Sequence, residues 1–373
     1  MRDSLRRTLA LSRKELYQIV RDPSSILIAF VLPLVLIFIF GYGLNLDSAH
    51  MRMAVVTLDE SAEAQRFASA FAGSPGIEAH PMKRREDAAR ALAAGAVRGI
   101  VVIENDFRAR LERGDGGAVQ VITDGSDPNT ASFAAAYAQG AWSRWQLDRD
   151  EERGLPEAAG VSLEPRYWYN PAAISRHFLV PGSIVLIMTV VGALLTSLVV
   201  AREWERGTME ALLSTPVTRA EFLLSKLLPY YVLGMASMAV CSTIAVAVLG
   251  TPLRGSLWAL FAVTSLFLAS ALGGGLLLST ALRNQFNAAQ AALNLAFLPA
   301  VMLSGFVFEI ASMPAPVRAL TYLLPARYFV SSLQTLFLAG DVARILLVNA
   351  LFLFAAAALL IGWTARITRR RLD

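Results

Sequence analysis

The sequence predicts an α-helical polytopic membrane protein with six transmembrane helices and an α/β domain inserted between the first two of them. Composition and patterning lead to this fold class. The chain of 373 residues is 55% hydrophobic, with a mean hydropathy of +0.50, which is more apolar than an ordinary soluble domain. The apolar residues are collected in long blocks, whereas the stretch between the first two blocks alternates strand-like and helix-like patterns.

Six apolar runs are long enough to cross a bilayer, which takes about 20 apolar residues. Asp, Glu, Lys and Arg are absent from all of them. The runs are residues 24–44, 178–201, 227–249, 256–282, 286–308 and 345–365. The first run is too long for a signal peptide and lacks a following cleavage site, so it is predicted to be an uncleaved span. A seventh apolar patch, residues 328–340, is too short to span and is expected to be interfacial or re-entrant.

The distribution of Arg and Lys predicts the orientation of the chain. These residues are frequent in the N-terminal arm, in the loop after the second run and in the C-terminal tail, and scarce in the opposite loops. Since positively charged flanks stay in the cytoplasm, both termini are predicted to be cytoplasmic and residues 46–176 to lie outside. The net charge of +5 follows from this bias. Nucleic-acid binding is disfavoured because the basic residues flank the runs and form no single patch.

The N-terminal arm, residues 1–23, is predicted to be an amphipathic helix that lies in the membrane interface on the cytoplasmic side. Leu5, Leu9, Leu16 and Ile19 can share one face of it, with Arg and Lys on the opposite face. The alternative is a plain positively charged anchor for the first span.

The insert, residues 45–177, is predicted to fold as an α/β domain with a mixed sheet. Its expected strands are residues 52–59, 99–103, 118–123 and 163–169, and its expected helices are residues 63–72, 85–96, 106–113 and 129–153. The last of these helices is expected to return to the membrane. Glycine-rich stretches between these elements are interpreted as turns, because they lack the Lys-Ser/Thr of a phosphate-binding loop.

Residues 178–373 hold the other five spans and two connecting segments of interest. The loop after the second run is predicted to form a short amphipathic helix, with Met209, Leu212 and Leu213 on one face at helical spacing. It is longer than a simple chain reversal requires, and we interpret it as a contact point for another protein. After the fifth run, glycine and prolines in residues 303–340 predict short outer-side helices that dip back toward the bilayer. A plain interfacial connector is the alternative.

A few polar and small residues lie inside the apolar runs. Ser279, Gln290 and Asn294 are expected to make hydrogen bonds between helices, which we favour over contacts with a ligand. The three consecutive glycines at 273–275 are expected to allow close packing of helices. The single cysteine, Cys241, is interpreted as a packing residue.

A series of short motifs follows one another along nearly the whole chain. The most specific of them is Glu205-Arg206-Gly207-Thr208 after the second run. The others are Lys14-Glu15, Arg21-Asp22-Pro23, residues 167–171, residues 180–182, residues 212–216, residues 303–306, Met313-Pro314 and Leu324-Pro325. In these motifs and in their order, the sequence resembles the permease subunits of bacterial ABC-2-type exporters that carry a large extracytoplasmic domain after the first span, and the resemblance covers essentially the whole length.

The resemblance implies a permease subunit in a bacterial inner membrane. Such subunits pair, with an identical or a sister permease, and each binds a separate cytoplasmic ATPase that holds ATP and Mg. A periplasmic adaptor is a further partner in some systems. The cargo implied is apolar or amphipathic, because the spans are uncharged, and lipids, hydrophobic drugs and steroid-like molecules fit equally well.

The same resemblance assigns three groups of functional residues. A coupling segment at residues 203–217, which would pass the ATPase motion to the membrane, contains Glu203, Glu205, Arg206, Gly207, Thr208, Glu210, Leu212, Leu213 and Pro216. The interfacial helix contributes Lys14, Glu15, Arg21 and Asp22. An outer gate consists of Leu303, Ser304, Gly305 and Phe306.

The sequence carries no chemistry of its own. The ATPase motif Gly-x-x-x-x-Gly-Lys-Ser/Thr is absent, so this chain is not expected to be an enzyme or to bind a cofactor. His50, His80 and His177 do not have metal-ligand spacing. Two other classes remain as alternatives: a membrane-anchored sensor with the insert as its receptor, and a scaffold for envelope export without transport of its own.

Overall fold

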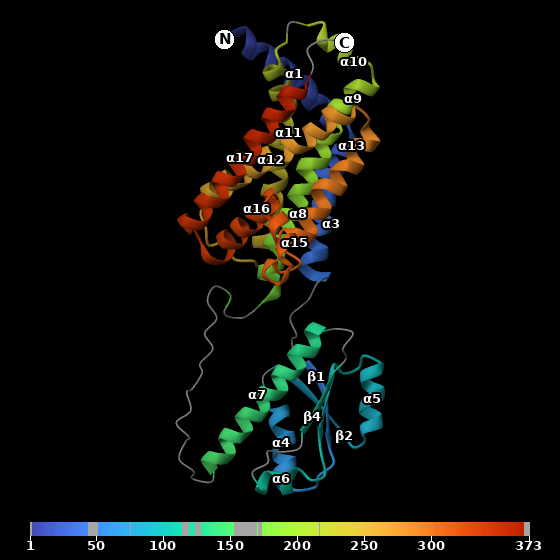
Figure 1. Cartoon of the computed structure of the whole chain (residues 1–373), viewed down its shortest axis with the longest axis vertical. Helices are drawn as coiled ribbons and strands as arrows, with labels where there is room; N and C mark the ends of the chain where they lie inside the picture. The colour runs from blue at the N-terminus through green and yellow to red at the C-terminus, as the bar shows by residue number, and fades with distance from the viewer. Residues whose placement is uncertain are drawn as a thin grey trace. The chain divides into compact units, whose positions relative to one another are not determined.

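The computed structural model of the chain describes residues 2–43, 51–74, 76–113, 119–123, 128–152, 170, 174–215 and 217–368. The chain divides into two compact units. One is the helical unit, Met1–Leu46 with Arg166–Asp373, and the other is the α/β unit, Asp47–Pro165. Figure 1 shows the helices of the first unit and the sheet of the second.

Among its described residues, the helical unit begins with α1 (Arg2–Arg21) and contains six helical segments that are long and apolar enough to cross a membrane. Each corresponds to one of the six apolar runs of the sequence. The segments are Pro23–Gly43, Ser175–Glu205, Arg219–Ala247, Leu257–Leu282, Gln285–Leu303 and Ala343–Ile367.

Several of these segments are built from more than one element. The first consists of α2 (Pro23–Ile26), η1 (Leu27–Val31), α3 (Leu32–Phe38) and η2 (Ile39–Gly43). The second consists of α8 (Ser175–Ser197) and α9 (Val199–Glu205), and the fifth of α13 (Gln285–Ala292), η3 (Leu293–Phe297) and α14 (Leu298–Leu303). The others are single helices: α11 (Arg219–Ala247), α12 (Leu257–Leu282) and α17 (Ala343–Ile367). The connections hold α10 (Thr208–Leu213), η4 (Ile310–Ser312), α15 (Ala315–Thr321), α16 (Pro325–Gln334) and η5 (Thr335–Ala339).

Prolines explain two of the π-helical turns. Pro33 follows η1 and Pro299 follows η3, each at the second position of the next α-helix. A proline inside a helix lacks a backbone N–H and clashes with the carbonyl four residues before it. A wider turn at that point lets the segment continue across the apolar layer without a break.

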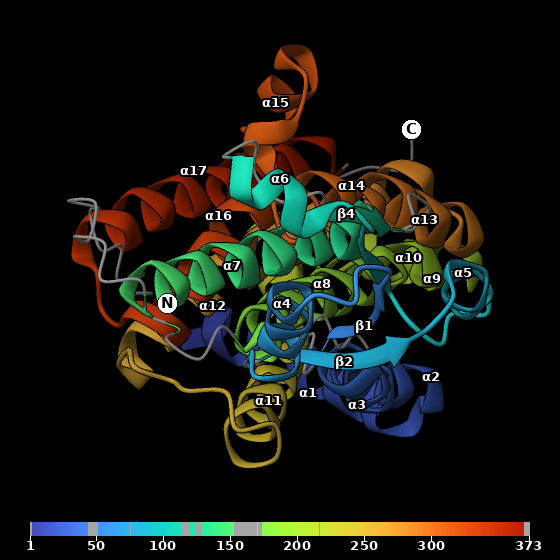
Figure 2. The same ribbon diagram turned by 90° about the horizontal axis from the view of Figure 1, so that it is seen from below.

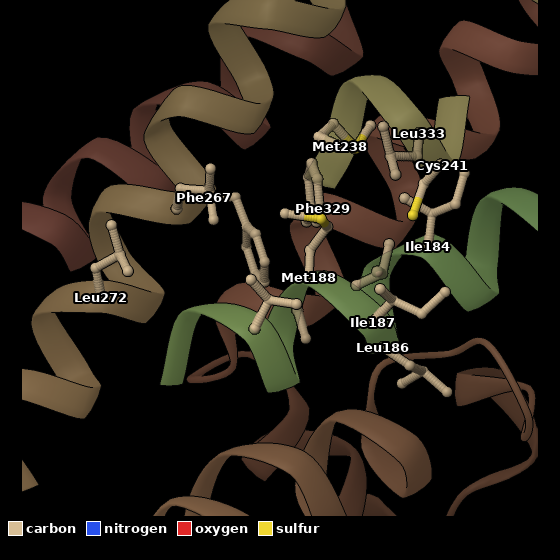
Figure 3. Close-up of a cluster of buried hydrophobic side chains, with 14 of the residues drawn as sticks. Ile184, Leu186, Ile187, Met188, Met238, Cys241, Phe267, Leu272, Phe329 and Leu333 are labelled. Carbon is tan, nitrogen blue, oxygen red and sulfur yellow. The ribbon is translucent and has the colours of Figure 1, made fainter. Parts of the chain in front are cut away.

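The core of the helical unit is formed around α8, which is buried over most of its length. It contacts α12, α11 and α16. Phe329 of α16 stacks on Phe267 of α12 with ring centroids 4.0 Å apart, and Figure 3 shows both rings among Ile184, Met188 and Cys241. Phe329 belongs to the apolar patch at 328–340, which was expected to be interfacial or re-entrant. This patch therefore packs among the candidate spans.

Close packing of α12 depends on its small residues, as we expected for the three glycines at 273–275. A Cβ on Gly275 would lie 2.3 Å from the carbonyl oxygen of Ala193 in α8. One turn further, the Ser279 hydroxyl accepts hydrogen bonds at 2.9 Å from the backbone N–H groups of Val200 and Ala201. These groups begin α9 after the break in the second span, so the expected interhelical hydrogen bond of Ser279 is confirmed.

The α/β unit contains a four-stranded mixed sheet in the order β2-β1-β3-β4. The strands are β1 (Met51–Thr57), β2 (Ile77–Met82), β3 (Gly99–Ile103) and β4 (Val119–Thr123), and the helices are α4 (Ala62–Ala72), α5 (Arg85–Ala93), α6 (Phe107–Arg113) and α7 (Pro128–Glu152). β1 is parallel to β2 and β3, while β4 is antiparallel to β3.

Helices cover both faces of this sheet. Side chains of α4, α6 and α7 pack on one face, where Phe67, Phe107 and Trp145 form an aromatic cluster, and α5 packs on the other. Figure 2 shows α5 on the side of the strands away from α4 and α7. The helix expected to return to the membrane, α7, contacts the sheet of this unit. The expected strand at 163–169 lies outside the described residues, and β2 was not predicted.

Candidate functional site

One end of the helical unit, where α1, α9 and α10 lie together (Figure 1), is held by charged side chains. We call it the charged end. α1 lies along α11 and buries Ser12, Glu15 and Ile19, which repeat at helical spacing. The apolar face that the sequence predicts for α1 is divided, because Ile19 is buried whereas Leu5, Leu9 and Leu16 are exposed.

A buried lysine lies at the centre of the charged end. Lys226 in the first turns of α11 places its Nζ 2.5 Å from Glu15 Oε2 of α1 and 2.7 Å from Glu203 Oε1 of α9. The three side chains are 5–6% exposed. Lys226 therefore connects the N-terminal helix, the second span and the third span through one ammonium group. We call Glu15, Glu203 and Lys226 the ion triad.

Neighbouring groups complete the charge balance of the ion triad. Lys14 Nζ lies 3.4 Å from Glu203 Oε1, so two cations face two carboxylates. The Tyr230 hydroxyl donates to Glu15 Oε1 at 3.3 Å, and the Thr208 hydroxyl donates to Glu203 Oε2. Buried charges are tolerated when they are paired and their remaining hydrogen-bonding positions are filled, and both conditions are met here.

Two further ion pairs hold the ends of α1. Arg7 pairs with Glu221 at 3.1 Å, and Glu221 also accepts from the Thr218 backbone N–H in the capping box that begins α11. Arg202 pairs with Asp22 at 3.0 Å. Partial burial alone would raise the pKa of the Asp22 carboxyl, but hydrogen bonds from Ser24 and the positive charge of Arg202 outweigh it and lower that pKa.

The first two glutamates of the predicted coupling segment bond it to other helices. Glu203 belongs to the ion triad. Glu205 accepts a 2.8 Å hydrogen bond from the backbone N–H of Gln285 and another from the Gln285 side chain, at the first residue of α13. Between them, Trp204 packs under the Arg283 guanidinium, 4.4 Å from the ring centroid. The end of the second span is thus bonded to α1, to α11 and to the start of the fifth span.

The outward side of the same segment is open. Arg206, Gly207, Thr208 and Glu210 are all exposed. Gly207 has a φ of +67°, and it begins α10 as its N-cap residue. This left-handed backbone explains the glycine, since an L-residue with a Cβ is strained there.

The apolar residues of α10 are less available than the sequence suggested. Met209 is buried in the core of the helical unit and Leu212 is half-buried. The side chain of Leu213 and the whole of Pro216 lie outside the description that the structure gives. Any partner of this segment would therefore meet mainly the polar and charged residues at 206–210.

The predicted outer gate lies at the other end of the helical unit. Leu303 ends α14, while Ser304 and Phe306 are buried. The Phe306 ring fills the space over Gly182 of α8, where a Cβ would lie 2.0 Å from Phe306 Cδ2, and it meets the Phe40 ring edge-on at 5.8 Å. Gly305 makes the turn with a φ of +87°. Phe306 is thus inserted between the first two spans of its own chain.

The fifth span carries polar side chains on its surface. Asn287, Gln290 and Asn294 follow one another at helical spacing on α13 and η3, and all three are exposed. Neither Gln290 nor Asn294 makes a side-chain hydrogen bond in the part of the chain that the structure describes, so the bonds expected between helices of one chain are not formed there. The spacing of these polar residues could be read from the sequence.

The role of Lys226 in the ion triad could not be read from the sequence, because its partners Glu15 and Glu203 come from segments that are remote in the chain.

Comparison with known proteins places this arrangement in a family. Residues 23–366 match the family described as ABC-2 family transporter protein. The chain belongs to the ABC-2 transporter family. It is 57% identical over 371 residues to the probable multidrug ABC transporter permease YbhS of Escherichia coli (strain K12), a match that covers 99% of this chain and 98% of that protein.

More distant ABC-2 relatives match over most of their length. The probable multidrug ABC transporter permease YbhR of Escherichia coli (strain K12) is 28% identical over 89% of this chain and 90% of its own. The linearmycin resistance permease protein LnrN of Bacillus subtilis (strain 168) is 24% identical over 94% of this chain and 98% of its own. The family match begins at residue 23, so it includes Glu203 and Lys226 but not Glu15 of α1.

Proposed function

We propose that this ABC-2 protein is the permease subunit of an exporter that moves apolar or amphipathic compounds out of the cytoplasm or the inner leaflet. A separate ATPase subunit, which binds ATP and Mg, docks on residues 206–210 and drives the transport. The two relatives from Escherichia coli are both described as probable multidrug ABC transporter permeases, which supports this class of cargo.

The observation that carries the proposal is the two-sided geometry of the coupling segment. Arg206, Gly207, Thr208 and Glu210 are exposed, whereas the carboxylates of Glu203 and Glu205 are bonded to other helices. A displacement applied at the outward side is passed through Glu203 to α1 and α11, and through Glu205 to α13. α13 continues through η3 and α14 to Leu303, the first residue of the predicted gate.

The exposed polar residues of the fifth span support pairing with a second permease. Unsatisfied amide groups facing hydrocarbon each cost several kcal/mol, at order of magnitude. Gln290 and Asn294 are relieved of that cost if their face meets another permease or the cargo pathway instead of lipid. The partner is a second copy of this chain or a sister permease, as the presence of two relatives in Escherichia coli suggests.

The proposal includes an orientation: both termini in the cytoplasm and the α/β unit outside. Single cysteines at Ser61 and Ser214, in a Cys241→Ala background, test it with a thiol reagent that does not cross membranes. We expect labelling at position 61 in spheroplasts and labelling at position 214 only after the membrane is opened. Labelling in the opposite pattern would reverse the assignment.

The coupling role is tested by changing only the outward side of the segment. Arg206→Glu inverts a charge and Gly207→Trp fills the surface of the turn, and neither residue touches the ion triad. We expect both variants to insert and dimerise but to lose co-purification of the ATPase and permease-stimulated ATP hydrolysis. Arg344→Glu, an exposed arginine at the start of α17, is the matched control. Normal coupled hydrolysis in both variants would exclude residues 206–210 as the docking site.

A further inference from the structure

A cavity of about 660 Å³ opens at the charged end, beside the ion triad and between α1 and α9. Its walls carry four cations, namely Lys14 and Arg21 of α1 and Arg202 and Arg206 after the second span. Gln285 at the start of α13 contributes an amide. We call this cavity the basic pocket. Its volume lies in the range of ordinary small-ligand sites, about 300–1,000 Å³.

The chain neutralises only part of the charge of the basic pocket, because Lys14 pairs with Glu203 and Arg202 with Asp22 but Arg21 and Arg206 lie in no ion pair among the described residues. In the part of the chain that the structure describes, Asp22 is the single carboxylate that lines it, and this group already accepts hydrogen bonds from Ser24 and Ser25 and pairs with Arg202. Among the described residues, no carboxylate lies within ion-pair distance of Arg21 or Arg206. Two guanidinium groups therefore face the pocket with donors free, which is the geometry that binds phosphate oxygens.

The apolar runs place the basic pocket at the boundary of the membrane. Pro23 immediately precedes the run at 24–44, Arg202 immediately follows the run at 178–201, and Gln285 immediately precedes the run at 286–308. All three line the pocket, so the ends of three spans converge on it. Lipid headgroups lie at this depth, just outside the hydrocarbon layer.

We infer that the basic pocket binds the phosphate-bearing headgroup of an anionic phospholipid. Cation-lined pockets between helices at the cytoplasmic surface are suited to such lipids, because the leaflet there is negatively charged. The assignment to the cytoplasmic leaflet rests on the proposed orientation. A bound headgroup would join α1, the end of the second span and the start of the fifth span, three of the four elements that the coupling segment connects.

An acidic segment of the ATPase is the competing occupant, and position argues against it. The proposed docking residues Gly207, Thr208 and Glu210 do not line the pocket, which extends from Arg206 back to Pro23 and Gln285. Only Arg206 is common to both surfaces. A substitution of Arg21 therefore tests lipid binding alone, and a substitution of Gly207 tests ATPase docking alone.

The experiment measures binding of dioctanoyl phosphatidylglycerol to the full-length permease purified in a neutral detergent, by native mass spectrometry and by the shift in melting temperature. Dioctanoyl phosphatidylcholine has the same chains with no net charge, and sodium phosphate supplies the anion without chains. We expect saturable binding of phosphatidylglycerol and little of the other two. Equal binding of phosphatidylcholine, or full occupation by free phosphate alone, would overturn the lipid assignment.

Substitutions of the arginines that line the basic pocket test whether the lipid binds there. At about 1 kcal/mol for each cation, Arg21→Gln should weaken phosphatidylglycerol binding about fivefold and Arg21→Gln with Arg206→Gln roughly 30-fold. Arg318→Gln with Arg344→Gln removes the same charge from the other end of the unit and should leave the affinity unchanged.

Equal loss in both double variants would mean a general effect of net charge and would contradict the pocket. Unchanged lipid binding in Arg21→Gln with lost ATPase co-purification would make the pocket a protein-docking site. Because the lipid titration contains no ATPase, a failure of the proposed coupling does not affect it.

Discussion

The two ends of the helical unit are held together by different interactions. At the charged end, α1, α9 and α11 meet through the ion triad, and their contacts depend on charge and on hydrogen-bond direction. At the gate end, Phe306 is held by shape, because its ring occupies the space left by Gly182. Ionic contacts can exchange partners when a neighbouring charge moves, whereas a ring seated on a glycine either fits or is displaced.

This difference suits the roles that we propose for the two ends. An ATPase that docks on residues 206–210 acts next to groups that respond to small displacements of charge. The response at the gate end requires a packed aromatic residue to leave its position, which favours two discrete arrangements over a gradual one. The comparison can be tested by weakening each end separately.

Removal of the central cation should have the largest effect. Lys226→Met leaves Glu15 buried without a counter-charge and leaves Glu203 with Lys14 alone. Breaking a buried pair in this way costs about 3–5 kcal/mol of unfolding free energy. The melting temperature of the purified permease measures it. Replacing all three charges with Lys226→Met, Glu15→Gln and Glu203→Gln should recover most of the loss. A single variant as stable as the parent would show that the ion triad is not structurally important.

A methyl group at the gate end should have a smaller effect. Gly182→Ala forces the Phe306 ring to move, and overpacking of this kind costs about 1–3 kcal/mol. Phe306→Leu in the same chain should relieve the clash, so the two changes should be non-additive in a double-mutant cycle. Gly362→Ala, at a helical glycine with open space around it, serves as the control and should cause no loss of stability. Additive effects of the two changes would contradict the packing of Phe306 on Gly182.

The smallest expected effect is the dependence of stability on pH that Asp22 contributes at the charged end. Because the pKa of Asp22 is lowered below its ordinary 3.8, the folded protein keeps this carboxylate charged at a pH where the unfolded chain has begun to protonate. Its contribution is therefore complete at neutral pH and is lost as the pH falls through the lowered pKa. Asp22→Asn should remove this dependence, with a difference below about 1 kcal/mol. Melting curves between about pH 3 and pH 7 measure it, and parallel curves for the two proteins would refute it.

Local signals in the sequence were sufficient for much of the fold. The six spans follow from runs of apolar residues, and β3 and β4 follow from short β-branched stretches, since both patterns depend on neighbours in the chain. β2 was missed because Ile77–Met82 contains His80, Pro81 and a glutamate and is buried only at its start. An edge strand of this kind has no regular apolar alternation.

The candidate site was predicted only in part, because its contacts join residues that are far apart in the chain. Glu15, Glu203 and Glu205 were singled out by resemblance, but their partners Lys226 and Gln285 were not. Glu15 and Lys226 are 211 residues apart in sequence, and Glu205 and Gln285 are 80 apart. Contacts at such distances are decided by how the helices pack, which no local pattern encodes. The same holds for α16, whose burial depends on α8 and α12.

The burial of α16 constrains the way the protein is made. α16 and η5 together run from residue 325 to residue 339, about 22 Å of helix, which is shorter than the hydrocarbon layer of about 30 Å. A translocon that releases segments by hydrophobicity and length cannot place such a helix stably in lipid by itself. Because α16 contacts α17 as well as α8 and α12, we expect it to reach its buried position only after α17 has been inserted. A nascent chain that stops before α17 is then expected to leave Phe329 and Leu333, both buried here, without their full packing.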